Sequence, residues 1–121
     1  MFRKLALICT LLVVGIVSVA FAQAKQDFTL VNRTGYVIDE VYVSPSKSSD
    51  WQDDVLGEGV MVNGKVVNIR FSRAAKTCKW DLKVVYDDKS TAEWDGFDLC
   101  TVSKITIYYD RKNDVTSADA E

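Results

Sequence analysis

The sequence contains no histidine, a single proline and only three cysteines among its 121 residues. Histidine is the commonest general base and a usual zinc ligand, so its absence excludes catalytic triads and zinc sites that depend on imidazole. No run of basic residues is longer than Arg111-Lys112. The chain therefore has neither the basic stripe of a nucleic-acid-binding protein nor a polybasic segment for an anionic membrane.

Residues 1–22 have the three-part layout of a secretory signal peptide. Two basic residues precede an uncharged run over 5–21, which is followed by small residues that allow cleavage after Ala22 or after Ala24. An uncleaved membrane anchor is the alternative, because this run approaches the roughly 20 residues that span a bilayer. We expect an exported chain, periplasmic or secreted, that leaves the membrane after cleavage. Removing residues 1–22 changes the formal charge from −2 to −4.

Two cysteines, Cys78 and Cys100, lie outside the signal segment. In an exported chain an even pair predicts a disulfide, and two sulfurs without histidine make a poor zinc site. Two free thiols are the alternative. Closing a loop of about 22 residues contributes roughly 3 kcal/mol in the chain-entropy model, a large share of a total stability of about 5–15 kcal/mol.

Alternating apolar and polar residues predict short β-strands and no helix of three turns. The clearest example runs from Cys78 to Tyr86, where Trp80, Leu82 and Val84 share one face with the two ends. Further strands are expected at 28–31, at 36–43 with a bulge near Asp39-Glu40, at 60–62 and 66–71 around the hairpin turn Asn63-Gly64, at 91–94 and at 105–109.

These patterns predict a single all-β domain over residues 23–110. We expect a small antiparallel β-sandwich of six or seven strands, with one short helical turn and one disulfide; a small β-barrel is the alternative. Residues 111–121 contain one apolar side chain larger than alanine, Val115. They are predicted to be a disordered polar tail.

The polar stretch from Tyr42 to Gly59 interrupts the strand pattern. Ser49 or Asp50 can cap a helical turn that Gly57 ends in the left-handed conformation, with Trp51 and Leu56 facing the core as a plug. Calcium binding is the alternative use of this loop, because calcium takes six to eight oxygen ligands. The candidate ligands are Asp50, Asp53 and Asp54, joined by Asp87-Asp88 or Asp95-Asp98 from other loops. No other cofactor is expected.

Asn32-Arg33-Thr34 matches the N-glycosylation sequon, but a turn ending at Gly35 explains the same residues. Three aromatic residues, Tyr42, Trp51 and Trp94, are the candidate partner-binding residues, because clustered exposed aromatics favour a partner surface. We expect no catalytic residues. A carboxylate pair that acts on glycosides is the remaining enzymatic alternative.

Several motifs are spread over nearly the whole expected domain. They are Asn32-x-Thr34-Gly35, Tyr42-x-Ser44-Pro45-Ser46, Trp51-x-x-Asp54-x-Leu56-Gly57, Cys78-x-Trp80-Asp81-Leu82 and Leu99-Cys100. Together they resemble a family of small exported bacterial proteins with the pattern N-x-[ST]-G … YxSPS … W-x-x-D-x-LG … C-x-[WY]-D-[LI] … LC. The resemblance implies the compartment and the fold, and it implies no activity.

The leading hypothesis is a non-enzymatic exported β-sandwich, monomer or weak dimer, that binds a protein or a cell-envelope component and no nucleic acid. One alternative is a calcium-dependent binding or stability module that uses the aspartate loops. Another is a periplasmic inhibitor of an enzyme, since small disulfide-bonded β domains can serve as inhibitors.

Overall fold

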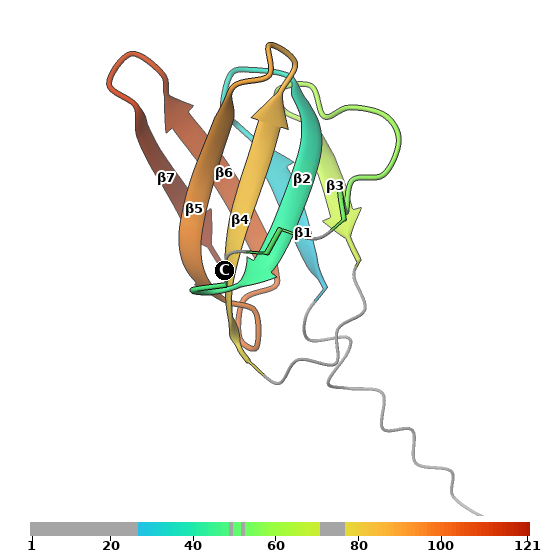
Figure 1. Ribbon diagram of the computed structural model, residues 1–121, viewed down its shortest axis with the longest axis vertical. Helices are drawn as coiled ribbons and strands as arrows, with labels where there is room; N and C mark the ends of the chain where they lie inside the picture. The colour runs from blue at the N-terminus through green and yellow to red at the C-terminus, as the bar shows by residue number, and fades with distance from the viewer. Residues whose placement is uncertain (1–26, 49, 52, 71–76) are drawn as a thin grey trace, which may run out of the picture.

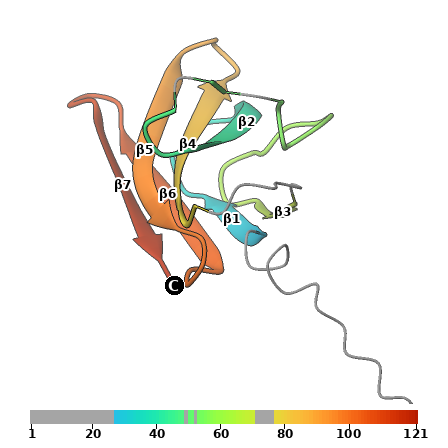
Figure 2. The same cartoon turned by 60° about the horizontal axis from the view of Figure 1, so that its bottom comes forward.

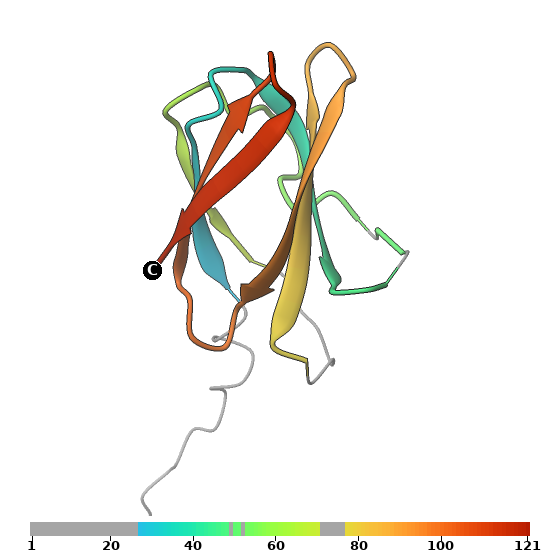
Figure 3. The ribbon, with the colours of Figure 1, turned by 90° about the vertical axis from the view of Figure 1, so that its left-hand side faces the viewer.

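The computed structural model describes residues 27–48, 50–51, 53–70 and 77–121, and the expected signal peptide lies outside them. Seven strands form two sheets, in the orders β3-β1-β6-β7 and β2-β4-β5 (Figure 1). The strands are β1 (Phe28–Asn32), β2 (Ile38–Pro45), β3 (Val66–Ile69), β4 (Lys79–Tyr86), β5 (Thr91–Asp98), β6 (Lys104–Asp110) and β7 (Val115–Ala120). The two sheets lie face to face (Figure 3), which confirms the predicted β-sandwich and excludes a closed barrel.

The core lies between the sheets and follows the period-2 pattern of the sequence. On β4, Trp80, Leu82, Val84 and Tyr86 are at most 1% exposed, and their polar neighbours along the strand face away from the core. The opposite sheet contributes further buried residues: Phe28, Leu30, Ile69, Ile105 and Ile107. Each buried side chain of this size contributes about 1.5–3 kcal/mol, so burial between the sheets is the main favourable term in folding.

Strand pairing is antiparallel except between β1 and β6, which run parallel with Leu30 opposite Ile105. Figure 2 shows these two strands, from opposite ends of the chain, side by side. The expected irregularity near Asp39 is confirmed, because the register of β2 against β4 shifts between Ile38 and Glu40.

The prediction of a disordered tail over residues 111–121 is wrong. Residues of β7 pair with β6 from Ile105 opposite Ala120 to Asp110 opposite Val115. Backbone pairing needs no large side chains, and the small residues of β7 fit a strand at the edge of a sheet. The Trp94 indole also donates a hydrogen bond to the Ser117 carbonyl oxygen at 2.8 Å. The domain therefore includes β7 and extends beyond residue 110.

The predicted disulfide between Cys78 and Cys100 is formed, with a Cα–Cα distance of 5.2 Å. It joins the residue before β4 to the loop after β5. The Leu99 amide donates to the Cys78 carbonyl oxygen at 2.9 Å, and the Cys100 amide donates to Asp98 Oδ1 at 3.0 Å. Among the described residues, no helix has the length and apolar character needed to cross a membrane.

Candidate functional site

Two of the three aromatic residues predicted to bind a partner come together on the outer face of the β2-β4-β5 sheet. Tyr42 of β2 lies opposite Lys83 of β4 in the strand register. The Lys83 Nζ atom lies 5.9 Å from the centroid of the Tyr42 ring and 5.8 Å from the centroid of the Trp51 ring. Cation–π contacts of this kind contribute about 0.5–1 kcal/mol each at exposed sites. We call this group the Tyr42–Trp51–Lys83 surface.

The third aromatic residue, Trp94, does not belong to this surface. Its side chain is 5% exposed and lies in the core, opposite Leu82 in the register of β4 and β5. The expectation that Trp94 contacts a partner is therefore wrong. Alternation along the first half of β5 places Trp94 on the same buried face as Ala92, and the register of β4 and β5 shifts only beyond Trp94, between Leu82 and Trp80, so the local pattern of β5 already indicated a core position.

Glu40 fixes the orientation of the Tyr42 ring. The Tyr42 hydroxyl donates a hydrogen bond to Glu40 Oε1, and this bond is the main cause that raises the pKa of Tyr42 to about 12. Partial burial and the Glu40 charge act in the same direction. At neutral pH the phenol is uncharged, and the site presents two aromatic rings, one ammonium and one carboxylate.

The loop that carries Trp51 is anchored to the free edge of β2. Asp54 Oδ1 accepts hydrogen bonds from the backbone amides of Val41 at 2.8 Å and Leu56 at 2.9 Å. The Val55 amide donates to the Val41 carbonyl oxygen at 2.8 Å. Asp54 and Val55 therefore satisfy the edge of β2 in the way that a neighbouring strand does.

A second anchor lies on the other side of Trp51. The hydroxyl of Ser44, which is 1% exposed, donates to the carbonyl oxygen of Asp50 at 2.9 Å. The Asp50 amide in turn donates to the Ser48 hydroxyl at 3.2 Å. Trp51 is thus held from both sides by contacts that the motifs around Ser44 and Asp54 supply.

The expected helical turn in this loop is not formed among its described residues, and the proposed cap at Ser49 lies outside them. The Asp54 carboxylate bonds the amide two residues ahead, which is a local alternative to helix formation. Gly57 has the predicted left-handed conformation, with φ of 74°, but it ends a turn and not a helix. Leu56 packs against the core as predicted, whereas Trp51 lies over Lys83 and is no plug.

The predicted calcium ligands are not brought together. In the part of the chain that the structure describes, the one group of three or more potential ligand residues with atoms within 4.8 Å of one another is Cys78, Asp98 and Cys100. Both of its sulfur atoms are joined in the disulfide. Asp50, Asp53 and Asp54 form no such group. Calcium binding by this loop stays a prediction that the geometry does not favour.

The glycosylation motif is a buried turn. Asn32 is fully buried, and its Nδ2 donates to the carbonyl oxygens of Tyr36 at 2.8 Å and Met61 at 2.9 Å. Its Oδ1 accepts hydrogen bonds from the Thr34 amide at 3.0 Å and the Thr34 hydroxyl at 2.6 Å. Both amide hydrogens of Asn32 are used within the fold, which supports the turn interpretation of the sequon.

One cluster was missed from the sequence because its residues come from three distant segments. The Arg111 guanidinium carbon lies 3.8 Å from the Tyr36 ring centroid and 5.2 Å from that of Tyr86. Tyr109 stacks on Tyr86 with centroids 5.7 Å apart, and Arg111 Nη1 lies 2.9 Å from Asp88 Oδ2. The cluster joins the β4–β5 turn to the β6–β7 turn across the two sheets. Arg111 already occupies it, so we assign it a structural role.

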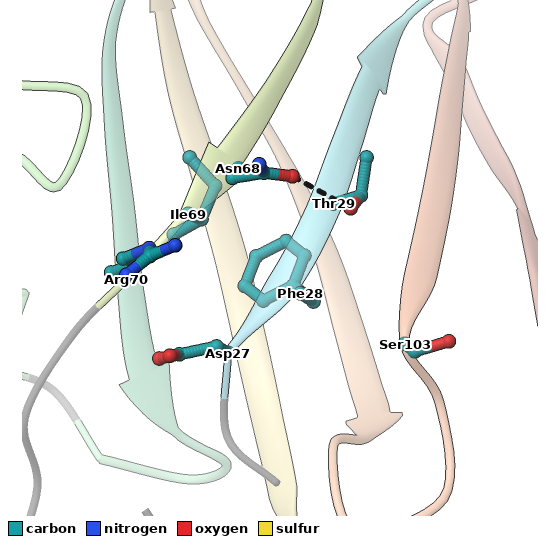
Figure 4. Close-up of a pocket in the computed structure, with 7 residues that line it drawn as sticks. All are labelled: Asp27, Phe28, Thr29, Asn68, Ile69, Arg70 and Ser103. Atoms are coloured by element: carbon teal, nitrogen blue, oxygen red, sulfur yellow. Dashed lines mark hydrogen bonds between the residues drawn. The ribbon is translucent and has the colours of Figure 1, made fainter. Parts of the chain in front are cut away.

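A hollow of about 330 Å³ lies beside the first residues of β1 and the last residues of β3 (Figure 4). Figure 4 shows Asp27 and Arg70 at one side, the Phe28 ring in the middle and Ser103 at the opposite side. The lining is mixed in charge and polarity, so it selects no class of ligand.

No family model, curated protein or solved structure matches this chain.

Proposed function

We propose that this chain is a non-enzymatic exported β-sandwich, periplasmic or secreted, that binds a protein or cell-envelope partner through the Tyr42–Trp51–Lys83 surface. The observation that carries the proposal is that the Lys83 ammonium lies 5.9 Å and 5.8 Å from the centroids of two aromatic rings, those of Tyr42 and Trp51. The disulfide is compatible with an oxidising compartment.

The composition of this surface suits an interface. Tyrosine and tryptophan combine a large apolar area with a polar atom, and they are enriched among the residues that dominate binding energy. Lys83 and Glu40 add one charge of each sign beside the rings. A partner that offers an acidic group to Lys83 and an apolar group to the rings would be recognised by charge and by shape.

The surface is also preorganised. Tyr42 and Lys83 stand on paired strands, and the loop with Trp51 is anchored through Asp54 and Ser44. Binding to residues held in this way costs less conformational entropy than binding to a loop that must first be ordered.

The non-enzymatic part of the proposal rests on chemistry that the chain lacks. It has no histidine, and both cysteines of the described residues, Cys78 and Cys100, are joined in a disulfide, so this part of the chain offers neither an imidazole nor a free thiol as base or nucleophile. If the partner is an enzyme, the protein would act as an inhibitor, so identifying the partner tests this alternative.

Site-specific photocross-linking tests the proposal. A photoreactive phenylalanine analogue replaces Trp51 in one variant and Tyr108 in a control, because Tyr108 is an exposed tyrosine on the other sheet. We expect the probe at position 51, irradiated in cells, to yield a discrete cross-linked species that is absent from the control. Replacing Lys83 by glutamate in the probe-bearing chain should abolish that species. Equal cross-linking from both positions would contradict the proposal.

A further inference from the structure

The two sheets have four edge strands, and three of them contact another segment along their edge within the described residues. Asp54 and Val55 bond the edge of β2. The edges of β5 and β7 adjoin, and the Trp94 indole donates to the Ser117 carbonyl oxygen between them. β3 differs, because in the described part of the chain it pairs with β1 on one side and with no strand on the other. An unpaired edge is a template for an added strand.

Val66 on this strand is exposed, and so are two valines in the segment that leads into it. Val60, Val62 and Val66 are 44%, 51% and 56% exposed, and they are three of the five large hydrophobic residues exposed in the described chain. Soluble proteins usually protect edges with charge or proline. Here the strand Val66–Ile69 carries neither, and the cations Lys65 and Arg70 stand at its two ends.

The local charge is opposite to that of the chain. Residues 60–70 contain two basic and no acidic residues, whereas residues 23–121 carry a formal charge of −4. Lys65 and Arg70 are five residues apart, which corresponds to about 17 Å along a strand. A strand that matches this edge therefore has an acidic residue at each end of an uncharged stretch of four residues.

The register shows which backbone groups are available for pairing. The Asn32 amide donates to the Lys65 carbonyl oxygen at 3.0 Å, and Leu30 lies opposite Val67. Because hydrogen-bonded residues alternate along an antiparallel pair, the amides and carbonyls of Val66 and Asn68 point away from β1. These are the groups that an added strand would bond.

We propose that the β3 edge binds an extended peptide segment of a partner protein, in which two acidic residues flank four apolar or β-branched residues. The segment adds antiparallel to β3, with its acidic ends on Lys65 and Arg70. A second copy of this chain fits less well. In the self-pairing that joins Val66 of each copy to Asn68 of the other, Lys65 would lie opposite Ile69 of the other copy, so neither cation would meet an acidic group.

The test uses a synthetic peptide, Glu-Val-Thr-Val-Val-Glu with blocked termini, and isothermal titration of the oxidised protein. We expect saturable 1:1 binding. A peptide with lysine in place of both glutamates should bind about tenfold more weakly, because each end changes from attraction to repulsion. The variant Lys65→Glu should bind the glutamate peptide more weakly and the lysine peptide more tightly. Lys65 serves better than Arg70 here, because Arg70 shares its hollow with Asp27.

Backbone methylation of the peptide separates strand addition from apolar adhesion. Methyl groups on the amides of the third and fifth residues block the bonds to Asn68 and Val66, whereas methyl groups on the second and fourth face away from β3. We expect the first modification to abolish binding and the second to leave it within about twofold. Equal effects of the two modifications would overturn the proposal, and so would concentration-dependent dimerisation without peptide binding.

This proposal is independent of the Tyr42–Trp51–Lys83 surface. Trp51→Ala should bind the peptide with unchanged affinity, and a parallel loss of affinity in Trp51→Ala would refute the assignment to β3. Failure of the peptide to bind would leave the photocross-linking result at position 51 unaffected.

Discussion

Replacing Asn32 by alanine is expected to lower the free energy of unfolding by about 3 kcal/mol. The substitution removes a fully buried side chain that makes four hydrogen bonds, three within its own turn and one to the Met61 carbonyl oxygen. At an exposed position water would replace the lost side chain as a hydrogen-bond partner, but Asn32 is 0% exposed.

The magnitude follows from the partners that remain. The Thr34 amide loses its acceptor, and an unsatisfied buried donor costs about 1–3 kcal/mol. The Met61 carbonyl keeps the bond from the Ile38 amide at 2.9 Å, and the Tyr36 carbonyl keeps a longer one from the Thr34 hydroxyl at 3.3 Å. Losing the second bond at each carbonyl costs about 0.5–1 kcal/mol.

Urea denaturation of the oxidised protein measures this loss. We expect the midpoint to fall by about 1–3 M with an unchanged m value. Asn63→Ala is the matched control, because the Asn63 side chain accepts one exposed bond from the Gly35 amide, and it should cost less than about 1 kcal/mol. Equal losses in the two variants would refute the view that the Asn32-x-Thr34-Gly35 motif is a buried structural turn.

Three further predictions concern the disulfide, the tyrosine core and the anchored loop. Removing the disulfide with Cys78→Ser/Cys100→Ser should cost about 3 kcal/mol in urea melts, and a reduced wild type that melts no lower than the oxidised form would contradict this. Burial raises the pKa of Tyr86 to about 12, so its contribution to stability is complete below pH 10 and is lost between pH 10 and 12. Tyr86→Phe should therefore lose less stability than the wild type as the pH rises above 10. At pH 7 it should lower the free energy of unfolding only slightly, because the buried hydroxyl has no hydrogen-bond partner, and a loss above about 2 kcal/mol would contradict this. Asp54→Ala should lower the free energy of unfolding by about 2 kcal/mol, because two backbone amides lose their acceptor, and Asp53→Ala should lower it by less than about 0.5 kcal/mol. If calcium raises the Tm of the wild type and of neither variant, the calcium hypothesis is favoured instead.

Much of the fold follows from local patterns in the sequence. Alternation on β4 predicted the buried face with Trp80 and Leu82, and the bulge near Asp39 follows from a slip in that alternation. The disulfide followed from the compartment and an even number of cysteines. These features depend on residues close in the chain or on composition, so the sequence alone indicates them.

Features that depend on which strands pair were not predictable in this way. Val60–Val62 was expected to pair with the strand at 66–71 as a hairpin, yet Met61 forms an isolated bridge to Ile38 and β3 pairs with β1. β7 has too few apolar residues to be recognised by its pattern, and backbone bonds to β6 hold it in place.

Only part of the candidate site was predicted, because the rest depends on which strands pair. Tyr42 and Trp51 were identified as exposed aromatics, but Lys83 enters the site only through the register of β2 against β4. Asp54 was expected to be a calcium ligand, because loop aspartates supply the oxygen ligands that calcium takes. Its bonds to the Val41 and Leu56 amides show that it positions the loop.

The most direct test of the proposed function is the affinity of the partner identified by photocross-linking for three forms of the purified protein. The account predicts that Trp51→Ala binds at least tenfold more weakly than the wild type, since buried aromatic contacts dominate interface energies. Tyr108→Ala, on the other sheet, should bind within about twofold of the wild type. Unchanged affinity in Trp51→Ala, with its fold confirmed by an unaltered urea midpoint, would contradict binding through the Tyr42–Trp51–Lys83 surface.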